Sequence, residues 1–171
     1  MIKKNKAMDE ILLKLEKFKR NELLSIKYKN LKELMFPEFI QVDDCIISTQ
    51  CTSLQYINST QVTKENNNEI EENFNFTFGK IGYEYRYNEI VLNHFFEGKI
   101  SKNTLVNMGF AALKSWGAIL KKMEPQSKFW MILGCDRKTV MIRFHKQRDG
   151  EDLIFEDVDA IEQPVYCELI E

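Results

Sequence analysis

The chain has 171 residues, of which 44% are hydrophobic and 29% are charged, and its formal net charge is -2 at pH 7. This length favours one domain with a real hydrophobic core, and the near-neutral charge gives no sign of nucleic-acid binding. No apolar run approaches the roughly 18 residues of a membrane span, and charged residues follow the basic N-terminus where a signal peptide would be apolar. We therefore expect a single cytoplasmic domain over residues 1–171 that contacts no membrane.

The cysteines give no sign of a metal site. The four of them are scattered and form no CxxC pair, and the chain has only two histidines. We expect reduced, mostly buried thiols, and we predict neither a metal nor a cofactor.

Residues 1–36 are predicted to form a helical N-terminal region. Two apolar stripes at helical spacing run through residues 8–35, and a break near Arg20-Asn21 would give either two helices or one bent helix. Residues 1–35 contain ten Lys or Arg against five Asp or Glu. Such a basic face could lie on a membrane or a nucleic acid, but the interspersed glutamates favour a solvated surface.

Residues 42–171 are predicted to form a sheet with one long helix. Cys45–Thr49 and Leu54–Ile57 have the composition of strands. Residues 64–72 are polar and lack periodicity, which predicts a surface loop.

Two further strands are predicted before the long helix. Over Phe74–Phe78, phenylalanines alternate with polar residues, the clearest strand pattern in the chain. A turn at Gly79–Gly82 follows, and the alternating tyrosines of Tyr83–Tyr87 predict a strand that runs on through His94. That second half could instead be a short helix.

A long amphipathic helix is predicted over about residues 102–123. Its apolar stripe consists of Leu105, Met108, Ala112, Trp116, Ile119 and Met123. Ser101 or Asn103 can cap its first turn. Gly109 and Gly117 share a face and indicate the close approach of a neighbouring backbone.

A β-hairpin is predicted after this helix. Lys128–Cys135 contains five consecutive apolar residues, as in a strand covered on both faces, and Val140–His145 alternates as a second strand. We expect the Trp116 face of the helix to pack against Phe129 or Trp130. The predicted fold class is α+β, with an N-terminal helical segment and a mostly antiparallel sheet of about five or six strands under the long helix.

The last segment is strongly acidic. Residues 149–171 contain nine Asp or Glu and no Lys or Arg, but interleaved apolar residues argue against a disordered tail. We predict a helical or turn piece around Glu156–Glu162 and a terminal edge strand, Val165–Ile170.

An acidic surface on a folded frame is suited to docking a basic partner. It could equally face the basic N-terminal helix of the same molecule, or simply solvate the domain. The residues proposed for partner binding are Asp152, Glu156, Asp157, Asp159 and Glu162.

A second candidate group lies on the hairpin. Arg143 and His145 share a face of the predicted strand and Arg148 follows, so the three could hold an anion or act at a phosphate. A structural interpretation is a sheet-edge arginine paired with the acidic C-terminal segment and a half-buried histidine. Phosphate-binding glycine loops and a complete catalytic set are both missing, so no catalytic residue is assigned.

The C-terminal half also carries an extended pattern. It consists of Trp116-x₃-Leu120, Pro125, Lys128-Phe129, a hydrophobic strand, Asp136 and Met141-Ile-Arg-Phe-His145-x-x-Arg148-x-Gly-Glu151. This pattern is similar to that of small α+β immunity proteins, which accompany polymorphic or contact-dependent toxins in bacteria. The resemblance implies a cytoplasmic protein, monomer or homodimer, that binds one cognate toxin domain, often a basic nuclease, and blocks its active site.

Two functional hypotheses follow. The first is a non-enzymatic protein-binding module, an immunity protein that neutralises a cognate toxin through the acidic residues. The alternative is a small enzyme that acts on a phosphate-containing substrate through Arg143, His145 and Arg148.

Overall fold

A computed structural model describes residues 1–15, 31–50 and 79–171. In these residues an antiparallel five-stranded sheet has the order β1-β7-β5-β6-β4, and a two-stranded sheet, β2-β3, lies beside it. The strands are β1 (Ile2–Lys4), β2 (Phe39–Val42), β3 (Cys45–Ser48), β4 (Ile90–Val91), β5 (Lys128–Cys135), β6 (Val140–Gln147) and β7 (Val165–Ile170). The helices are α1 (Lys6–Leu15), α2 (Leu31–Met35), α4 (Gly79–Tyr87), α5 (Lys102–Met123) and a short 3₁₀ helix, η3 (Leu92–Phe95). The predicted α+β class is confirmed.

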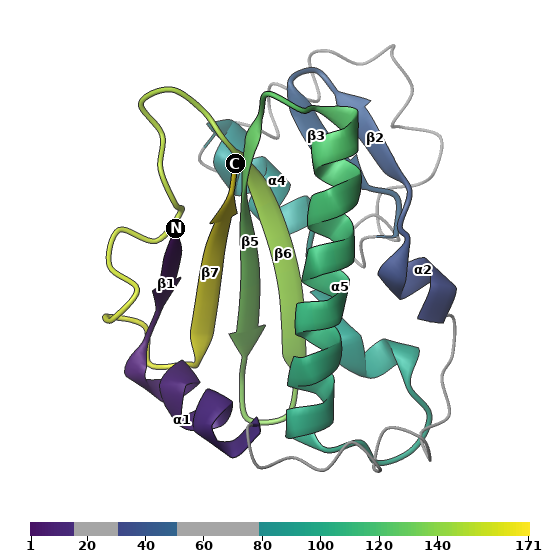
Figure 1. The fold of residues 1–171 in the computed structure, drawn as a ribbon, viewed down its shortest axis with the longest axis vertical. Helices are drawn as coiled ribbons and strands as arrows, with labels where there is room; N and C mark the ends of the chain where they lie inside the picture. The colour runs from purple at the N-terminus through teal and green to yellow at the C-terminus, as the bar shows by residue number, and fades with distance from the viewer. Residues whose placement is uncertain (16–30, 51–78) are drawn as a thin grey trace.

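The long helix α5 lies across one face of the sheet, which we call the first face (Figure 1). Its predicted range is confirmed, and Ser101 caps it by accepting a hydrogen bond from the Thr104 amide at 3.1 Å. The buried side is rotated slightly from the predicted stripe, since Leu113 and Leu120 are buried whereas Met123 is 43% exposed.

Trp116 of α5 packs over the first face, in the same hydrophobic cluster as Phe129, which is one of its two predicted neighbours. Its ring lies 6.1 Å from that of Phe144, which in turn lies 6.3 Å from Phe129. Trp130 belongs instead to a separate hydrophobic cluster on the opposite, second face of the sheet. The sheet is therefore covered on both sides, and Phe129 marks the side under the helix.

The two helix glycines let α5 approach the sheet closely. A Cβ atom at Gly109 would lie 2.6 Å from Leu133 Cδ1 and 3.0 Å from Leu92 Cδ1, and one at Gly117 would lie 3.0 Å from Ile170 Cδ1. The close approach is therefore confirmed, but its partners are apolar side chains rather than the predicted backbone.

The β5–β6 hairpin is confirmed over its full length, with Lys128 opposite Gln147 and Cys135 opposite Val140. The range of β7 is also as predicted, but β7 is not an edge strand. β1 pairs with its outer side and places Ile2 opposite Glu168, so β1 forms the edge of the sheet.

The strand predicted at Tyr83–Tyr87 is wrong, because Gly79–Tyr87 forms α4. The tyrosines alternate in sequence, yet Tyr83 and Tyr87 are one helical turn apart and their ring centroids lie 4.5 Å apart. The predicted continuation through His94 is also different, since β4 has two residues and η3 follows it.

Several predicted features lie outside the described residues. These are the Arg20-Asn21 break, the Leu54–Ile57 strand, the 64–72 loop and the Phe74–Phe78 strand. Within the described N-terminal residues, α1 and α2 agree with the predicted helical region. Of the helices described, none has both the length and the apolar character to cross a bilayer.

Candidate functional site: an acidic segment and an adjoining hollow

The acidic segment, residues 149–164, runs over the second face of the sheet without helix or strand. The short helical piece considered for Glu156–Glu162 is therefore a series of turns. Leu153 and Val158 are buried among Trp130 and the side chains of β7. These apolar contacts fix the course of a segment that lacks regular backbone pairing.

Asn5 holds the far end of this segment in place. Its side-chain nitrogen donates to the carbonyl oxygens of Ile161 and Gln163 at 2.8 and 2.7 Å. Its side-chain oxygen accepts from the amides of Met8 and Val165. Asn5 is only 2% exposed, so one buried amide joins the start of α1 to the acidic segment.

All five predicted partner-binding acids are exposed on this segment. Asp152 forms an ion pair with Lys3 of β1 at 3.4 Å. A hydrogen bond from the Leu153 amide and the nearby Lys3 ammonium lower the pKa of Asp152. The other four acids are Glu156, Asp157, Asp159 and Glu162, and no ion pair joins any of them to the described residues. Neutralisation by the N-terminal region is thus limited, within those residues, to the single contact from Lys3.

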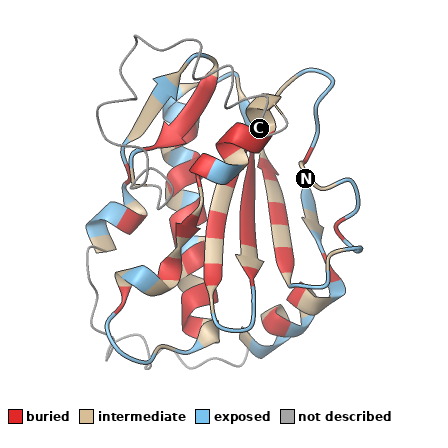
Figure 2. Cartoon of the chain, turned by 180° about the vertical axis from the view of Figure 1, so that it is seen from behind, coloured by how far each residue is buried: buried red, intermediate tan, exposed pale blue. Residues whose placement is uncertain are grey.

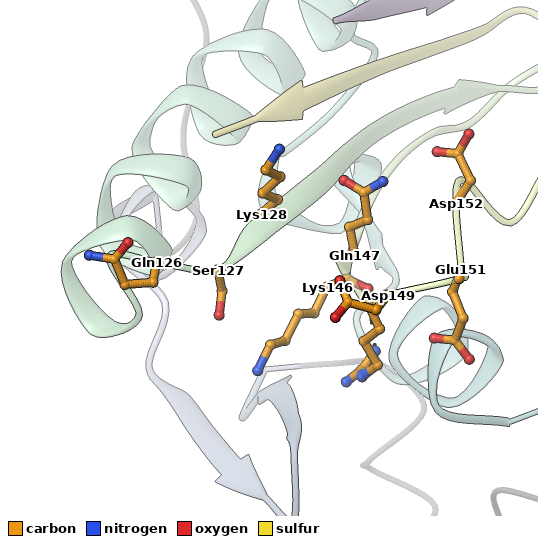
Figure 3. A pocket seen from close by; sticks show the side chains of 10 residues that line it. Gln126, Ser127, Lys128, Lys146, Gln147, Asp149, Glu151 and Asp152 are labelled. Atoms are coloured by element: carbon orange, nitrogen blue, oxygen red, sulfur yellow. Dashed lines mark hydrogen bonds between the residues drawn. The ribbon is translucent and has the colours of Figure 1, made fainter.

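Where this segment begins, the open end of the β5–β6 hairpin forms a surface hollow of about 690 Å³ (Figure 3). It is lined by Gln126, Ser127, Lys128, Lys146, Gln147, Arg148, Asp149, Gly150, Glu151 and Asp152. Gly150 has a φ of 78°, a left-handed conformation that favours glycine and lets the chain turn from the end of β6 into the acidic segment.

The three cations around the hollow are already paired with carboxylates. Lys146 contacts Asp44 at 2.7 Å and Glu124 at 2.8 Å. Lys128 lies 3.4 Å from Glu171. Burial opposes ionisation of Asp44, but hydrogen bonds from Lys146 and Arg148 outweigh it and lower the pKa of Asp44 to about 2.

Arg148 is held by two carboxylates beneath the hollow. Its Nε donates to Asp44 at 2.8 Å, and its two terminal nitrogens donate to the Glu84 carboxylate at 3.0 and 3.2 Å. The guanidinium side chain is 13% exposed and Glu84 is fully buried. Burial raises the pKa of Glu84, while the Arg148 guanidinium opposes that rise.

Glu84 of α4 and Asn88, the residue that follows α4, bridge the two sheets. Glu84 accepts the backbone amides of Ile46 and Lys146 at 2.9 and 2.8 Å. Asn88 accepts the Ser48 amide and donates to the carbonyl oxygens of Ile46 and Phe144. We call Glu84, Asn88 and Arg148 the clasp. Sequence reasoning missed the clasp. Had residues 79–87 been predicted as a helix, the i,i+4 spacing of Glu84 and Asn88 would have indicated that the two side chains lie on one side.

The structure does not bring Arg143, His145 and Arg148 into one site. Arg143 bonds to the Tyr85 hydroxyl and to Glu89, so the predicted pairing with the acidic C-terminal segment is wrong. Arg148, as part of the clasp, turns toward α4 and the β2–β3 turn instead.

His145 is fully buried on the second face, rather than half-buried. Its Nδ1 lies 3.2 Å from the Lys146 carbonyl oxygen and its Nε2 accepts the Ile154 amide at 3.4 Å. Burial lowers its pKa to about 4, which keeps the ring neutral at pH 7. With both ring nitrogens engaged, His145 anchors the acidic segment to β6.

The described residues offer no cluster of three His, Cys, Asp or Glu side chains arranged for a metal ion. Cys45, Cys135 and Cys167 are buried and unpaired thiols. Burial raises the pKa of Cys45 and of Cys167 to about 12, so both remain protonated at neutral pH. Cys51 lies outside the described residues.

Comparison with known proteins gives one family. No curated protein and no solved structure matches the chain significantly. One family model, described as the Uncharacterized protein PM0498 family, matches residues 3–170, from within β1 to the last residue of β7. The chain therefore belongs to the PM0498 family.

Proposed function

We propose that this chain is a non-enzymatic, cytoplasmic protein that binds a basic protein partner, and that the partner is a cognate bacterial toxin that it neutralises. The observation that carries the proposal is the acidic segment itself. Its five candidate acids are all exposed, while Leu153 and Val158 hold its backbone against the second face. Figure 2 shows the stretch between β6 and β7 as mostly exposed, with short buried parts. A fixed array of carboxylates is a surface that a basic partner can meet without first ordering it.

The charge arrangement predicts how such a partner would be recognised. Exposed carboxylates speed the encounter with a basic surface and reject acidic competitors, whereas buried contacts supply most of the affinity. The resemblance of the C-terminal pattern to that of immunity proteins supports a toxin domain as the partner, with its active site covered by this chain. Association should therefore slow steeply as salt is added.

The proposal predicts that a toxin domain is encoded beside this gene, and the test uses that domain. Co-expression of the chain should rescue growth of cells that make the toxin domain, and purified chain should bind that domain by calorimetry. Reversing Asp157, Asp159 and Glu162 to lysine should abolish rescue and weaken binding, because those side chains are exposed and lack ion pairs in the described residues.

A matched control separates the surface from net charge. Reversing Glu10, Glu33 and Glu97 to lysine changes the net charge equally at exposed positions on α1, on α2 and before α5. This variant should still rescue growth. Equal loss in both variants, or no loss in the first, would contradict the proposed surface.

A further inference from the structure

The strand β2 has an outer edge with which no strand of the described residues pairs. Its one neighbour is β3, and Figure 1 shows β2 on the side of β3 that is away from β6. The edge strand of the main sheet, β1, contains Lys3 and Lys4, and charged side chains discourage pairing with another molecule. β2 has the sequence Phe-Ile-Gln-Val, with neither a charge nor a proline. Its edge therefore lacks the protection that β1 has.

The hydrogen bonds of β3 establish which backbone groups of β2 point outward. The amides of Ile46 and Ser48 bond to side chains of the clasp, on the side of β3 away from β2. Because these groups alternate in direction along a strand, Ile47 bonds to β2, where it lies opposite Ile40. The residues on either side of Ile40 therefore direct their N–H and C=O groups outward, and no hydrogen bond to the rest of the described chain reaches those groups. These residues are Phe39 and Gln41.

A second copy of the chain can satisfy these groups in one symmetric register. With antiparallel pairing centred on Ile40, Phe39 of each protomer exchanges two hydrogen bonds with Gln41 of its partner, which gives four in all. A register centred on Phe39 would need an N–H group from Pro37, which has none. A register centred on Gln41 would need Asp43, which has left the strand with a φ of 53°. The backbone alone thus selects the register centred on Ile40.

The side chains are compatible with the same register. Ile40 lies opposite its own copy, and because it is only half-buried against the cluster around β3 and α4, each isoleucine can cover the other. The acids near the two ends of β2 do not meet, since Glu38 lies opposite Val42 and Asp43 lies opposite Pro37. No pair of like charges therefore opposes the contact.

We propose that two copies of this chain associate through β2, across a two-fold axis at Ile40, to form a four-stranded antiparallel sheet of order β3-β2-β2-β3. This inference goes beyond the proposed function, because it assigns a self-association surface to the chain in the absence of any toxin. The contact is small, so the dimer is weak and its population depends on concentration.

The first test is analytical ultracentrifugation of the whole chain over a concentration series, which should show a monomer–dimer equilibrium. Gln41→Pro removes one outward N–H group from each protomer and leaves the β2–β3 hydrogen bonds in place. Two of the four intermolecular hydrogen bonds are lost, so association should weaken by at least about tenfold. Gln41→Ala is the matched control, because it also loses the side chain but keeps the N–H group, and it should associate like the wild type. Thermal melting of both variants checks that they are folded.

The second test is a cross-link that depends on the register and not on the proline variant. Residues opposite each other in a pair without hydrogen bonds have Cα atoms about 4.5 Å apart, which is within the range of a disulfide. Ile40→Cys should therefore form a covalent dimer under mild oxidation. Gln41→Cys should form far less, because its partner in this register is Phe39, and the wild-type chain treated in the same way gives the background from the native cysteines.

Four results would overturn the assignment. They are a chain that stays monomeric at millimolar concentration, equal association of the folded proline and alanine variants, equal cross-linking of the two cysteine variants, or a monomeric chain whose binding to the toxin domain is abolished by Gln41→Pro. The last result would mean that the β2 edge receives a strand of the toxin instead of a second copy. If Gln41→Pro does not fold, the cross-linking comparison alone decides.

Discussion

Removing Arg148 should destabilise the fold more than removing any surface charge, because it leaves the buried Glu84 carboxyl without its counter-charge in a site from which water is excluded. In the folded protein Glu84 is fully buried and receives two N–H groups from Arg148 and two from backbone amides. Taking one partner from a buried ion pair costs about 3–5 kcal/mol. Arg148→Met should therefore lower the free energy of unfolding by about 3 kcal/mol, a large part of the total for a domain of this size.

The assay is urea unfolding followed by tryptophan fluorescence, since Trp116 and Trp130 are both fully buried. Arg143→Met, on the strand β6 that Arg148 directly follows, is the matched control. Its ion pair with Glu89 is partly exposed, with side chains 20% and 27% accessible, so its loss should cost about 1 kcal/mol. The double variant Glu84→Gln with Arg148→Met should recover part of the stability, because no buried charge is then left unpaired.

The pH dependence gives a second reading of the same variant. Without Arg148 the folded-state pKa of Glu84 rises further above its unfolded value. The proton then binds more tightly to the folded chain, so the variant should regain stability as pH falls through that raised pKa and lose it again as pH rises. A loss below about 1 kcal/mol, or a double variant no more stable than Arg148→Met, would refute the idea that Arg148 neutralises a buried carboxylate.

Three further predictions concern other parts of the frame. His145 has a pKa of about 4 in the folded chain against an ordinary 6.5, so the unfolded chain binds a proton first as pH falls below 6.5. The free energy of unfolding should therefore fall by up to about 3 kcal/mol between pH 6.5 and pH 4. His145→Gln should reduce this pH dependence in urea unfolding midpoints measured across the range. Gly109→Ala should lower the free energy of unfolding by about 1–3 kcal/mol because its Cβ meets two buried leucines, whereas Gly117→Ala should stay within about 1 kcal/mol of the wild type. Calorimetric melting that ranked the two variants in the opposite order would contradict the packing argument. Asn5→Ala removes four hydrogen bonds and should cost at least about 2 kcal/mol, with faster amide exchange in residues 156–165 than in α5; uniform exchange would argue against Asn5 as the anchor of the acidic segment.

Sequence patterns predicted those elements in which the spacing of apolar residues matches the side that is buried. The spacing of apolar residues in α5 and the alternation in β6 each reflect one buried face, so range and type were both predictable. The tyrosines of α4 misled for a definite reason. The alternation in Tyr83–Tyr87 is typical of a strand. In the structure, however, Tyr83 and Tyr87 pack against β3, whereas Tyr85 packs against the second face of the main sheet. The helix therefore buries aromatic residues on two of its sides.

Long-range contacts were beyond the reach of sequence patterns. β1 has three residues, and its pairing with β7 joins the two ends of the described chain, which no local period signals. The clasp depends on Arg148 meeting residues of α4 and of the β2–β3 turn. The exposure of the acidic segment could be predicted from its charge, but its attachment through Asn5 and His145 could not.

The use of Glu84 and Asn88 to join β3 to β6 has a consequence for self-association. Each strand would otherwise have free amide and carbonyl groups along one edge, with which a strand of another molecule could pair. Because the side chains of Glu84 and Asn88 bind those groups, the facing edges of both sheets are closed to such growth, although no continuous hydrogen-bond ladder joins them. Shortening Asn88 to alanine would reopen both borders at once, and turbidity on prolonged incubation of that variant is the expected sign.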